Sequence, residues 1–199
     1  MKNYGILASL DWNSNQWQDA PTEADIENTP FEWVKKDLRS DTCLNFGHKL
    51  FPTEDENYYL GNVPHFGNSG VDPKNATHVQ VVFFKSRNYQ DGKTYIVGFY
   101  AFPQLIRTRN RKGTHEMFAH SLEGNIRAKA EDIILLKNPL EVNDSDSFLP
   151  RNKVEEKTGY NFLKSKAVID LLGKIKENNM YLEFGKLYGK LIQSLEKRR

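Results

Sequence analysis

The sequence predicts an α+β domain in which helices flank a curved or barrel-like mixed β-sheet. First, strand-like and helix-like segments follow one another without the regular βαβ spacing of a doubly wound sheet. Second, residues 79–105 have the pattern of a β-hairpin, and third, two amphipathic helical segments close the chain. With 199 residues, of which 38% are hydrophobic, the chain is long enough to bury a core.

The central hairpin consists of two β-rich runs, Val79–Lys85 and Thr94–Phe102, that flank a turn at residues 86–92. Gly92 closes this turn, because glycine tolerates the positive φ that such turns require. Within the second run, Gly98 predicts a bend or a close approach of another group to the backbone. We expect this hairpin to form the centre of the sheet.

Before the hairpin, Tyr4–Leu10 is expected to be the first strand and Ala20–Asn28 a polar loop. Thr29-Pro30 is typical of a helix start and predicts a short helix at Phe31–Arg39, with Phe31, Val34 and Leu38 facing inward. Three short elements should follow: a strand or bend at 43–50, a strand at 58–61 and a helical turn at 72–76.

After the hairpin we expect a basic loop at Arg107–Gly113 and a buried strand at 133–136 that ends at Asn138-Pro139. Apolar residues then recur at helical spacing from Phe162 to Ile175, and Asn178-Asn179 should break this helix before a last one at Glu183–Lys197. The predicted organisation is therefore one domain at residues 1–177 and a C-terminal helix at 178–199 that would lead to a further domain.

Composition argues against several classes of protein. The single cysteine, Cys43, permits no disulfide within the chain and no cysteine-based metal cluster, and the histidines show no metal-ligand spacing. There is no apolar run of membrane-spanning length and no signal peptide, so we expect a cytoplasmic protein without a cofactor. Since no motif combines a nucleophile with a base, or acidic residues with a nuclease lysine, we expect a binding protein rather than an enzyme.

Charge is unevenly distributed. Lysine and arginine number 16 against 20 acidic residues in 1–150, and 12 against 6 in 151–199, within a total of 28 against 26. A second basic excess lies in Leu105–Lys129. Clustered basic side chains suit a phosphate backbone, although a solvated loop would explain them as well.

Two tryptophans, Trp12 and Trp17, stand among asparagine, serine and glutamine after the first strand. Such aromatic side chains can stack on a planar ring while neighbouring amides bind its edge. The alternative is that each tryptophan plugs the end of the barrel. Trp33 lies on a different face of its helix from Val34 and should either pack against a strand or border a pocket.

The hairpin sequence FFKSRNYQDGKTYIVGFYAF resembles the strand–turn–strand core of EVE and YTH domains of the PUA-like superfamily. The segment FLPRNKVEEKTGYNFL, followed by an apolar helix, resembles the closing part of the N-terminal DNA-binding modules of McrB-like restriction subunits. The resemblance implies a PUA-like fold and a reader of a modified base. The chain lacks a Walker A loop, so the GTP-dependent motor of such a system would lie beyond Arg199 and would act with a nuclease subunit.

The ligand that this resemblance implies is methylated duplex DNA, with 6-methyladenine flipped into an aromatic pocket. Methylated RNA remains an alternative, as does a protein-interaction domain that uses the last helix. The implied base pocket consists of Trp12, Trp17, Trp33, Phe46, Phe118, Ser9, Asn13, Asn15 and Asn45. The implied phosphate contacts are Arg87, Arg107, Arg109, Arg111, Lys112, Arg151 and Lys153.

Overall fold

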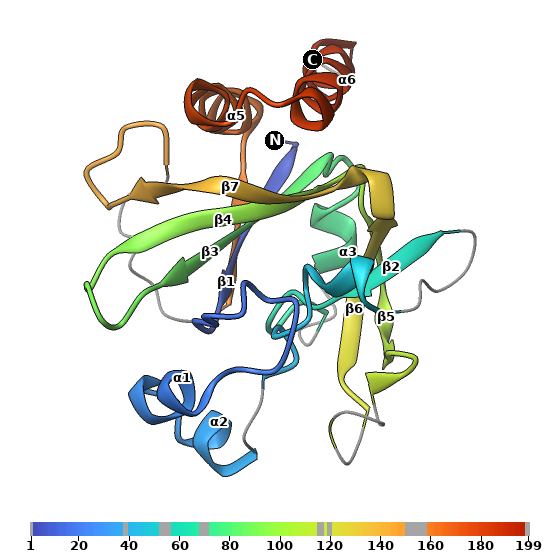
Figure 1. The fold of residues 1–199 in the computed structure, drawn as a ribbon. Coiled ribbons are helices and arrows are strands. Elements are labelled where there is room, and N and C mark those ends of the chain that lie inside the picture. The colour runs from blue at the N-terminus through green and yellow to red at the C-terminus, as the bar shows by residue number, and fades with distance from the viewer. Residues whose placement is uncertain are drawn as a thin grey trace.

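The structure is a computed structural model that describes residues 2–37, 40–51, 57–67, 72–114, 118, 121–149 and 159–197. It confirms the α+β class, since helices pack around a five-stranded and a three-stranded sheet (Figure 1). The expectation of a barrel-like sheet is corrected, because the described strands form two separate sheets and not a closed barrel.

The five-stranded sheet has the strand order β7-β4-β3-β1-β8. Its strands are β1 (Gly5–Leu10), β3 (Val81–Arg87), β4 (Thr94–Ala101), β7 (Ile133–Val142) and β8 (Tyr160–Leu163). The predicted hairpin is confirmed as β3 and β4, which pair antiparallel at the centre of this sheet. The first strand is also confirmed, and it pairs in parallel with β3, with Gly5 opposite Val81.

The three-stranded sheet has the order β2-β6-β5. Its strands are β2 (Tyr58–Gly61), β5 (Gln104–Asn110) and β6 (Glu123–Lys129). The predicted basic loop at 107–113 is wrong for its first half, because Arg107–Asn110 belong to β5. Since β5 lies at the edge of its sheet, charged side chains suit its exposed position and help to keep the edge from pairing with another chain.

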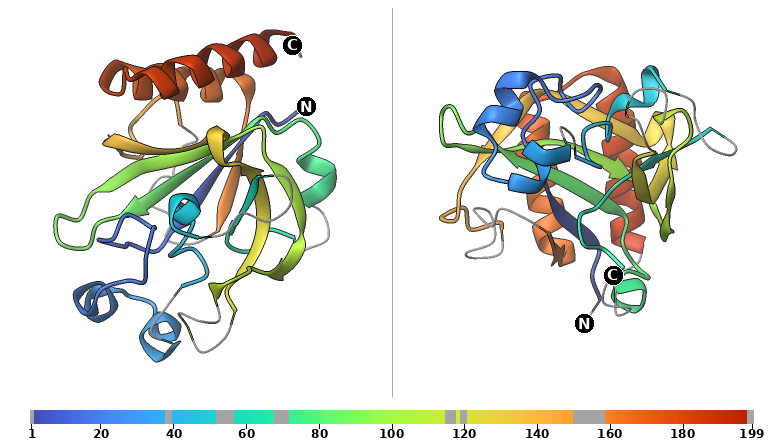
Figure 2. Two further views of the ribbon diagram at one scale, coloured as in Figure 1. Left: turned by 45° about the vertical axis from the view of Figure 1, so that its right-hand side comes forward. Right: turned by 90° about the horizontal axis from the view of Figure 1, so that it is seen from below.

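Helices α5 (Ser165–Asn178) and α6 (Leu182–Lys197) cover one face of the five-stranded sheet (Figure 2). The apolar side of α6, including Phe184 and Leu191, is buried in one core with Phe83 and Phe99 of the sheet. Both predicted helices are confirmed, as is the break between them. Asn179 ends α5 and donates from Nδ2 to the carbonyl oxygens of Ile175 at 3.1 Å and Asn138 at 2.9 Å.

A second core fills the space between the two sheets on the opposite face. Here Phe46 packs edge-on against Phe84 and Tyr100, with ring centroids 5.7 and 6.0 Å away. A Cβ atom at Gly98 would lie 2.4 Å from the carbonyl oxygen of Ile134 and 2.5 Å from the Phe46 ring, so a side chain there would force the strand or the ring to shift. The predicted close approach at Gly98 is therefore confirmed, and the pairing of β4 with β7 shifts register at this position.

Several local predictions were wrong. The expected loop at 20–28 contains α1 (Glu23–Asn28), whose start carries a capping box formed by Thr22 and Asp25. Strand β7 continues past Pro139, which a sheet tolerates at an irregularity in strand pairing. Phe162, which was expected within the first of the two last helices, belongs instead to β8, paired antiparallel with β1. The remaining short elements are α2 (Glu32–Asp37), α3 (Asp72–Asn75), η1 (Gly47–Lys49) and η2 (Ala130–Asp132).

Candidate functional site

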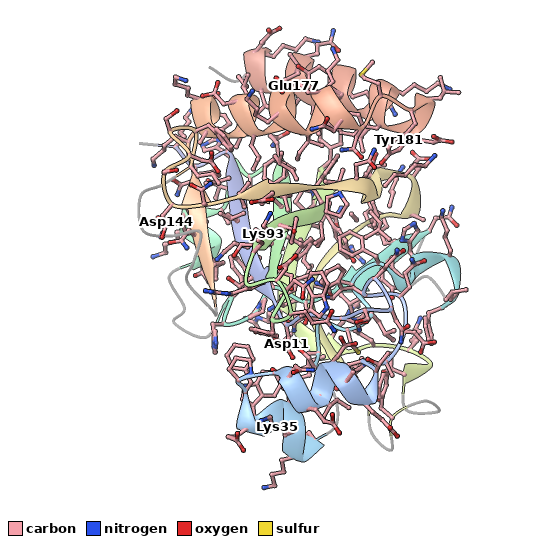
Figure 3. All side chains as sticks on the ribbon, turned by 60° about the vertical axis from the view of Figure 1, so that its left-hand side comes forward. Asp11, Lys35, Lys93, Asp144, Glu177 and Tyr181 are labelled. Carbon is pink, nitrogen blue, oxygen red and sulfur yellow. The ribbon has the colours of Figure 1, made fainter. Side chains whose placement is uncertain are left out.

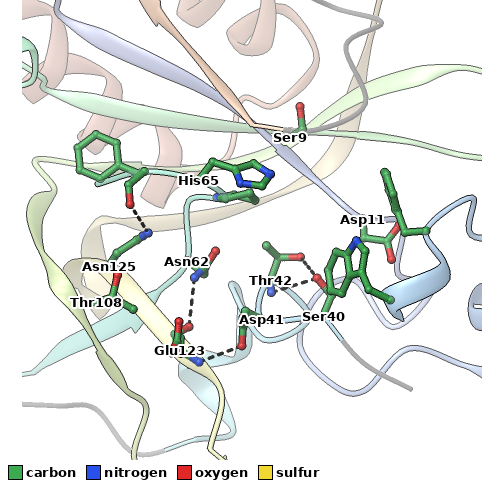
Figure 4. Close-up of a pocket in the computed structure, with 14 residues that line it drawn as sticks. Ser9, Asp11, Ser40, Asp41, Thr42, Asn62, His65, Thr108, Glu123 and Asn125 are labelled. Carbon is green, nitrogen blue, oxygen red and sulfur yellow. Dashed lines mark hydrogen bonds between the residues drawn. The ribbon is translucent and has the colours of Figure 1, made fainter. Parts of the chain in front are cut away.

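A cavity of about 240 Å³ opens between the end of β1, the start of α2 and the three-stranded sheet (Figure 4). Asp11 at its wall lies on the same side of the molecule as Lys35 of α2 and away from Glu177 and Tyr181 (Figure 3). The lining residues come from six separate segments of the chain. They are Ser9, Asp11, Phe31, Trp33, Ser40, Asp41, Thr42, Asn62, Pro64, His65, Phe66, Thr108, Glu123 and Asn125.

Hydrogen bonds among these residues form the walls of the cavity in advance of any ligand. Asn125 accepts from the backbone N–H of Val63 at 2.8 Å and donates to its carbonyl at 2.9 Å, which fixes the segment after β2. The Asp41 carboxylate accepts from the backbone N–H of Glu123 at 2.9 Å, and the hydroxyls of Ser40 and Thr42 lie 2.9 Å apart. A ligand would therefore meet a largely preorganised surface.

Two aromatic side chains of α2 and its approach form one rim. Trp33 is 50% exposed although it is large and apolar, and its ring lies 6.1 Å from that of Phe31 at an interplanar angle of 34°. An exposed indole beside a cavity offers a face on which a planar group can stack. Trp33 is thus the one predicted cage tryptophan that lines this cavity.

The Asp11 carboxyl at the cavity wall has a raised pKa. Burial is the largest effect and raises its pKa from 3.8 to about 6, although hydrogen bonds from Thr29 and Tyr89 oppose the shift. The Thr29 hydroxyl lies 3.0 Å from Oδ1 of Asp11. Burial, followed by the charge of Asp11, also raises the pKa of the Tyr89 hydroxyl. Asp11 therefore keeps a titratable group at the cavity wall.

This shift predicts a pH dependence of stability. Between pH 3.8 and 6 the folded protein binds more protons at Asp11 than the unfolded chain does, so the contribution of Asp11 to stability falls as pH rises through this range. Asp11→Asn should remove this loss and become progressively more stable relative to the wild type up to about pH 6. Urea unfolding of both proteins across this range measures the difference, and parallel curves would contradict the assignment. The neighbouring titratable and charged groups Asp25, Tyr89 and Arg87 are present in both proteins, so the difference between the two curves reports the Asp11 carboxyl.

The other two predicted tryptophans serve packing. Trp17 is 3% exposed in the second core and donates from Nε1 to the carbonyl oxygen of Asp11 at 2.8 Å. Trp12 is partly buried, with its ring 5.7 Å from Trp17 in an edge-on arrangement and 6.5 Å from Tyr95. The alternative placed each tryptophan at the end of a barrel, whereas the described strands form two separate sheets.

Among the remaining predicted pocket residues, only Ser9 lines the cavity. Asn13 and Asn15 donate to the carbonyl oxygens of Asp19 and Ala20 within their own loop, at 2.9 and 2.7 Å. Asn45 is fully buried and bonds through both amide atoms to the backbone of Asn62. The aromatic rings of Phe46 and Phe118 pack in separate apolar clusters, apart from Trp33.

The predicted phosphate contacts that the structure describes differ in their exposure. Arg107 and Arg109 are exposed on either side of Thr108 on β5, Lys112 is exposed beyond the strand, and Arg87 is partly buried at the end of β3. Arg111 is instead 3% exposed and donates to the carbonyl oxygens of Asp41 and Leu44 and to the Tyr59 hydroxyl, at 2.7–3.0 Å. Arg151 and Lys153 lie outside the described residues.

Within the described part of the chain, no group of three or more His, Cys, Asp or Glu side chains is arranged to hold a metal ion. The helices described there are too short or too polar to cross a bilayer. Comparisons with protein-family models, with curated proteins and with solved structures give no match for this chain.

Proposed function

We propose that this chain is a PUA-like module of the EVE/YTH type that binds a nucleic acid and holds one modified base in the cavity beside Trp33. The observation that carries the proposal is the half-exposed Trp33 indole at the rim of a preorganised cavity lined by hydroxyl, amide and carboxyl groups. An aromatic face combined with polar groups at the edge is the usual means by which proteins hold a single base.

The size of the cavity suits one ring system. Its volume of about 240 Å³ lies below the roughly 300–1,000 Å³ of pockets that enclose drug-sized ligands. Stacking on an aromatic side chain contributes about 1–3 kcal/mol per base, and extruding a base from a duplex costs a few kcal/mol. The stacking free energy therefore only slightly exceeds the cost of extruding the base. For this reason only a base that fits the cavity well is bound.

Two exposed arginines of β5, next to a lining residue in the sequence, support contacts with phosphates. Arg107 and Arg109 flank Thr108, a lining residue, and both are exposed on an edge strand. Contacts of this kind position the strand without reading its sequence, and they make affinity fall as salt rises.

The ligand that we propose is duplex DNA carrying 6-methyladenine, flipped into the cavity. In a longer protein such a module would direct a GTP-dependent motor and a nuclease subunit of a restriction system to modified DNA. Methylated RNA would use the same cavity and the same basic strand, so the experiment includes it.

The test is a fluorescence-anisotropy titration at fixed moderate salt. The ligands are three matched duplexes, unmodified, with 6-methyladenine and with 5-methylcytosine, and single strands of RNA with and without 6-methyladenine. We expect tighter binding to the 6-methyladenine duplex than to the unmodified one, and affinity for both should decrease with salt. Equal binding to every duplex and RNA would contradict the proposal and leave a general nucleic-acid module.

A further inference from the structure

We infer that the cavity selects a base that methylation on a ring nitrogen has made positively charged, such as 1-methyladenine or 3-methylcytosine. This inference rests on the part of the proposed function that places one modified base in the cavity, and it replaces 6-methyladenine with a charged base as the preferred ligand of that cavity. It follows from the charge of the groups that line the cavity, from one amide oxygen that faces the cavity, and from the aromatic rim.

The first argument is the charge of the lining. Three carboxyl groups, those of Asp11, Asp41 and Glu123, border the cavity, and among its described lining residues there is no lysine or arginine. Carboxylates accept hydrogen bonds and attract positive charge, and this attraction is stronger at a partly buried site than in water. A ring with a carbonyl edge would be repelled, whereas a cation with amino donors would be attracted.

The second argument is the Asn62 side chain, which is 8% exposed. Its Nδ2 donates to the carbonyl oxygen of Glu123 at 3.4 Å, and this bond fixes which way the amide points. The oxygen Oδ1 is directed into the cavity in Figure 4, where it is open to a ligand. An amide oxygen is an acceptor only, so a ligand that presents an N–H to it is favoured over one that presents a carbonyl.

The third argument is the aromatic rim. The Trp33 and Phe31 rings carry negative charge density on their faces, and a cation is attracted to such faces, to tryptophan most strongly. A positively charged base gains this attraction in addition to stacking, and a neutral base gains stacking alone. The exposed Arg107 and Arg109 stand outside the cavity, where phosphates rather than the base would meet them.

The experiment compares isomeric bases that differ in charge. Single-stranded DNA with one 1-methyladenine is compared with the same strand carrying one 6-methyladenine and with the unmodified strand, and 3-methylcytosine is compared with 5-methylcytosine. A trimethyl-lysine peptide is titrated in parallel. Single strands are used because a methyl group at these ring nitrogens disrupts base pairing and would favour flipping for unrelated reasons. We expect the charged member of each pair to bind about tenfold more tightly.

Two variants test whether the carboxylates cause this preference. Asp41→Asn and Glu123→Gln each remove a charge from the wall but keep an amide oxygen in place, so the preference for the charged base should fall severalfold. Glu177→Gln on α5 removes one charge at the far end of the molecule and should leave the preference unchanged. Unfolding curves of all three variants identify any that fails to fold.

The outcomes separate this inference from the proposed function. If 6-methyladenine binds as tightly as 1-methyladenine, or more tightly, and both bind better than adenine, the inference is wrong and the proposed function stands. If no modified strand binds better than the unmodified strand, both are wrong. If a trimethyl-lysine peptide binds more tightly than every strand, the cavity takes its cation from a protein, and both are again wrong.

Discussion

Trp17→Ala is expected to lower the free energy of unfolding by about 3–5 kcal/mol. The Trp17 indole is 3% exposed in the second core, and its ring packs edge-on against Trp12. Alanine would leave a cavity there and would remove the donor to the carbonyl oxygen of Asp11. Urea unfolding followed by intrinsic fluorescence or circular dichroism measures the change.

The matched control is Leu182→Ala, which also shortens a large apolar side chain. Leu182 is 69% exposed at the start of α6, so its removal should change stability by about 0.5 kcal/mol or less. A loss below about 1 kcal/mol for Trp17→Ala would show that the second core does not depend on this side chain.

Trp33→Ala should have the opposite profile, with a large effect on binding and a small one on stability. The side chain is 50% exposed, so little packing is lost when it is removed. Loss of one stacking partner should weaken binding of the modified duplex by about 1–3 kcal/mol, or roughly five- to 150-fold. Anisotropy titration at one salt concentration gives the ratio.

Trp33→Phe keeps an aromatic face and should recover most of that affinity, while Leu182→Ala should bind as the wild type does. Affinity for the unmodified duplex should change little in all three variants, since phosphate contacts on β5 supply most of it. If Trp33→Ala binds the modified and unmodified duplexes as the wild type does, Trp33 takes no part in recognising the base.

Much of the fold could be predicted because local patterns and tertiary packing agree. The hairpin of β3 and β4 combines β-branched residues with a Gly92 turn, and α6 has a regular apolar stripe that the core uses. Helix α1 was missed because its cap is Thr22 paired with Asp25 within an acidic, polar stretch. Strand β5 was missed because its identity depends on pairing with β6, which no local signal reveals.

The candidate site was harder to predict, since residue type does not tell whether a side chain faces a ligand or the core. Trp33 and Ser9 line the cavity, whereas Trp17 and Arg111 are bonded and buried by the fold itself. The other lining residues come from segments far apart in the sequence. Asp11 could have been found, because it follows the first strand directly and adjoins Trp12, but no local signal connects Asn62 with Glu123.

Strand β1 has neighbours from distant parts of the chain, and this constrains the order in which the protein can fold during synthesis. It is synthesised before the other described strands, yet it pairs with Val81–Ser86 on one side and with Tyr160–Leu163 on the other. Until β8 has been made, one edge of β1 stays open to pairing with other chains. We therefore expect slow folding with a late step at β8, and nascent chains that end before Tyr160 should be prone to aggregation.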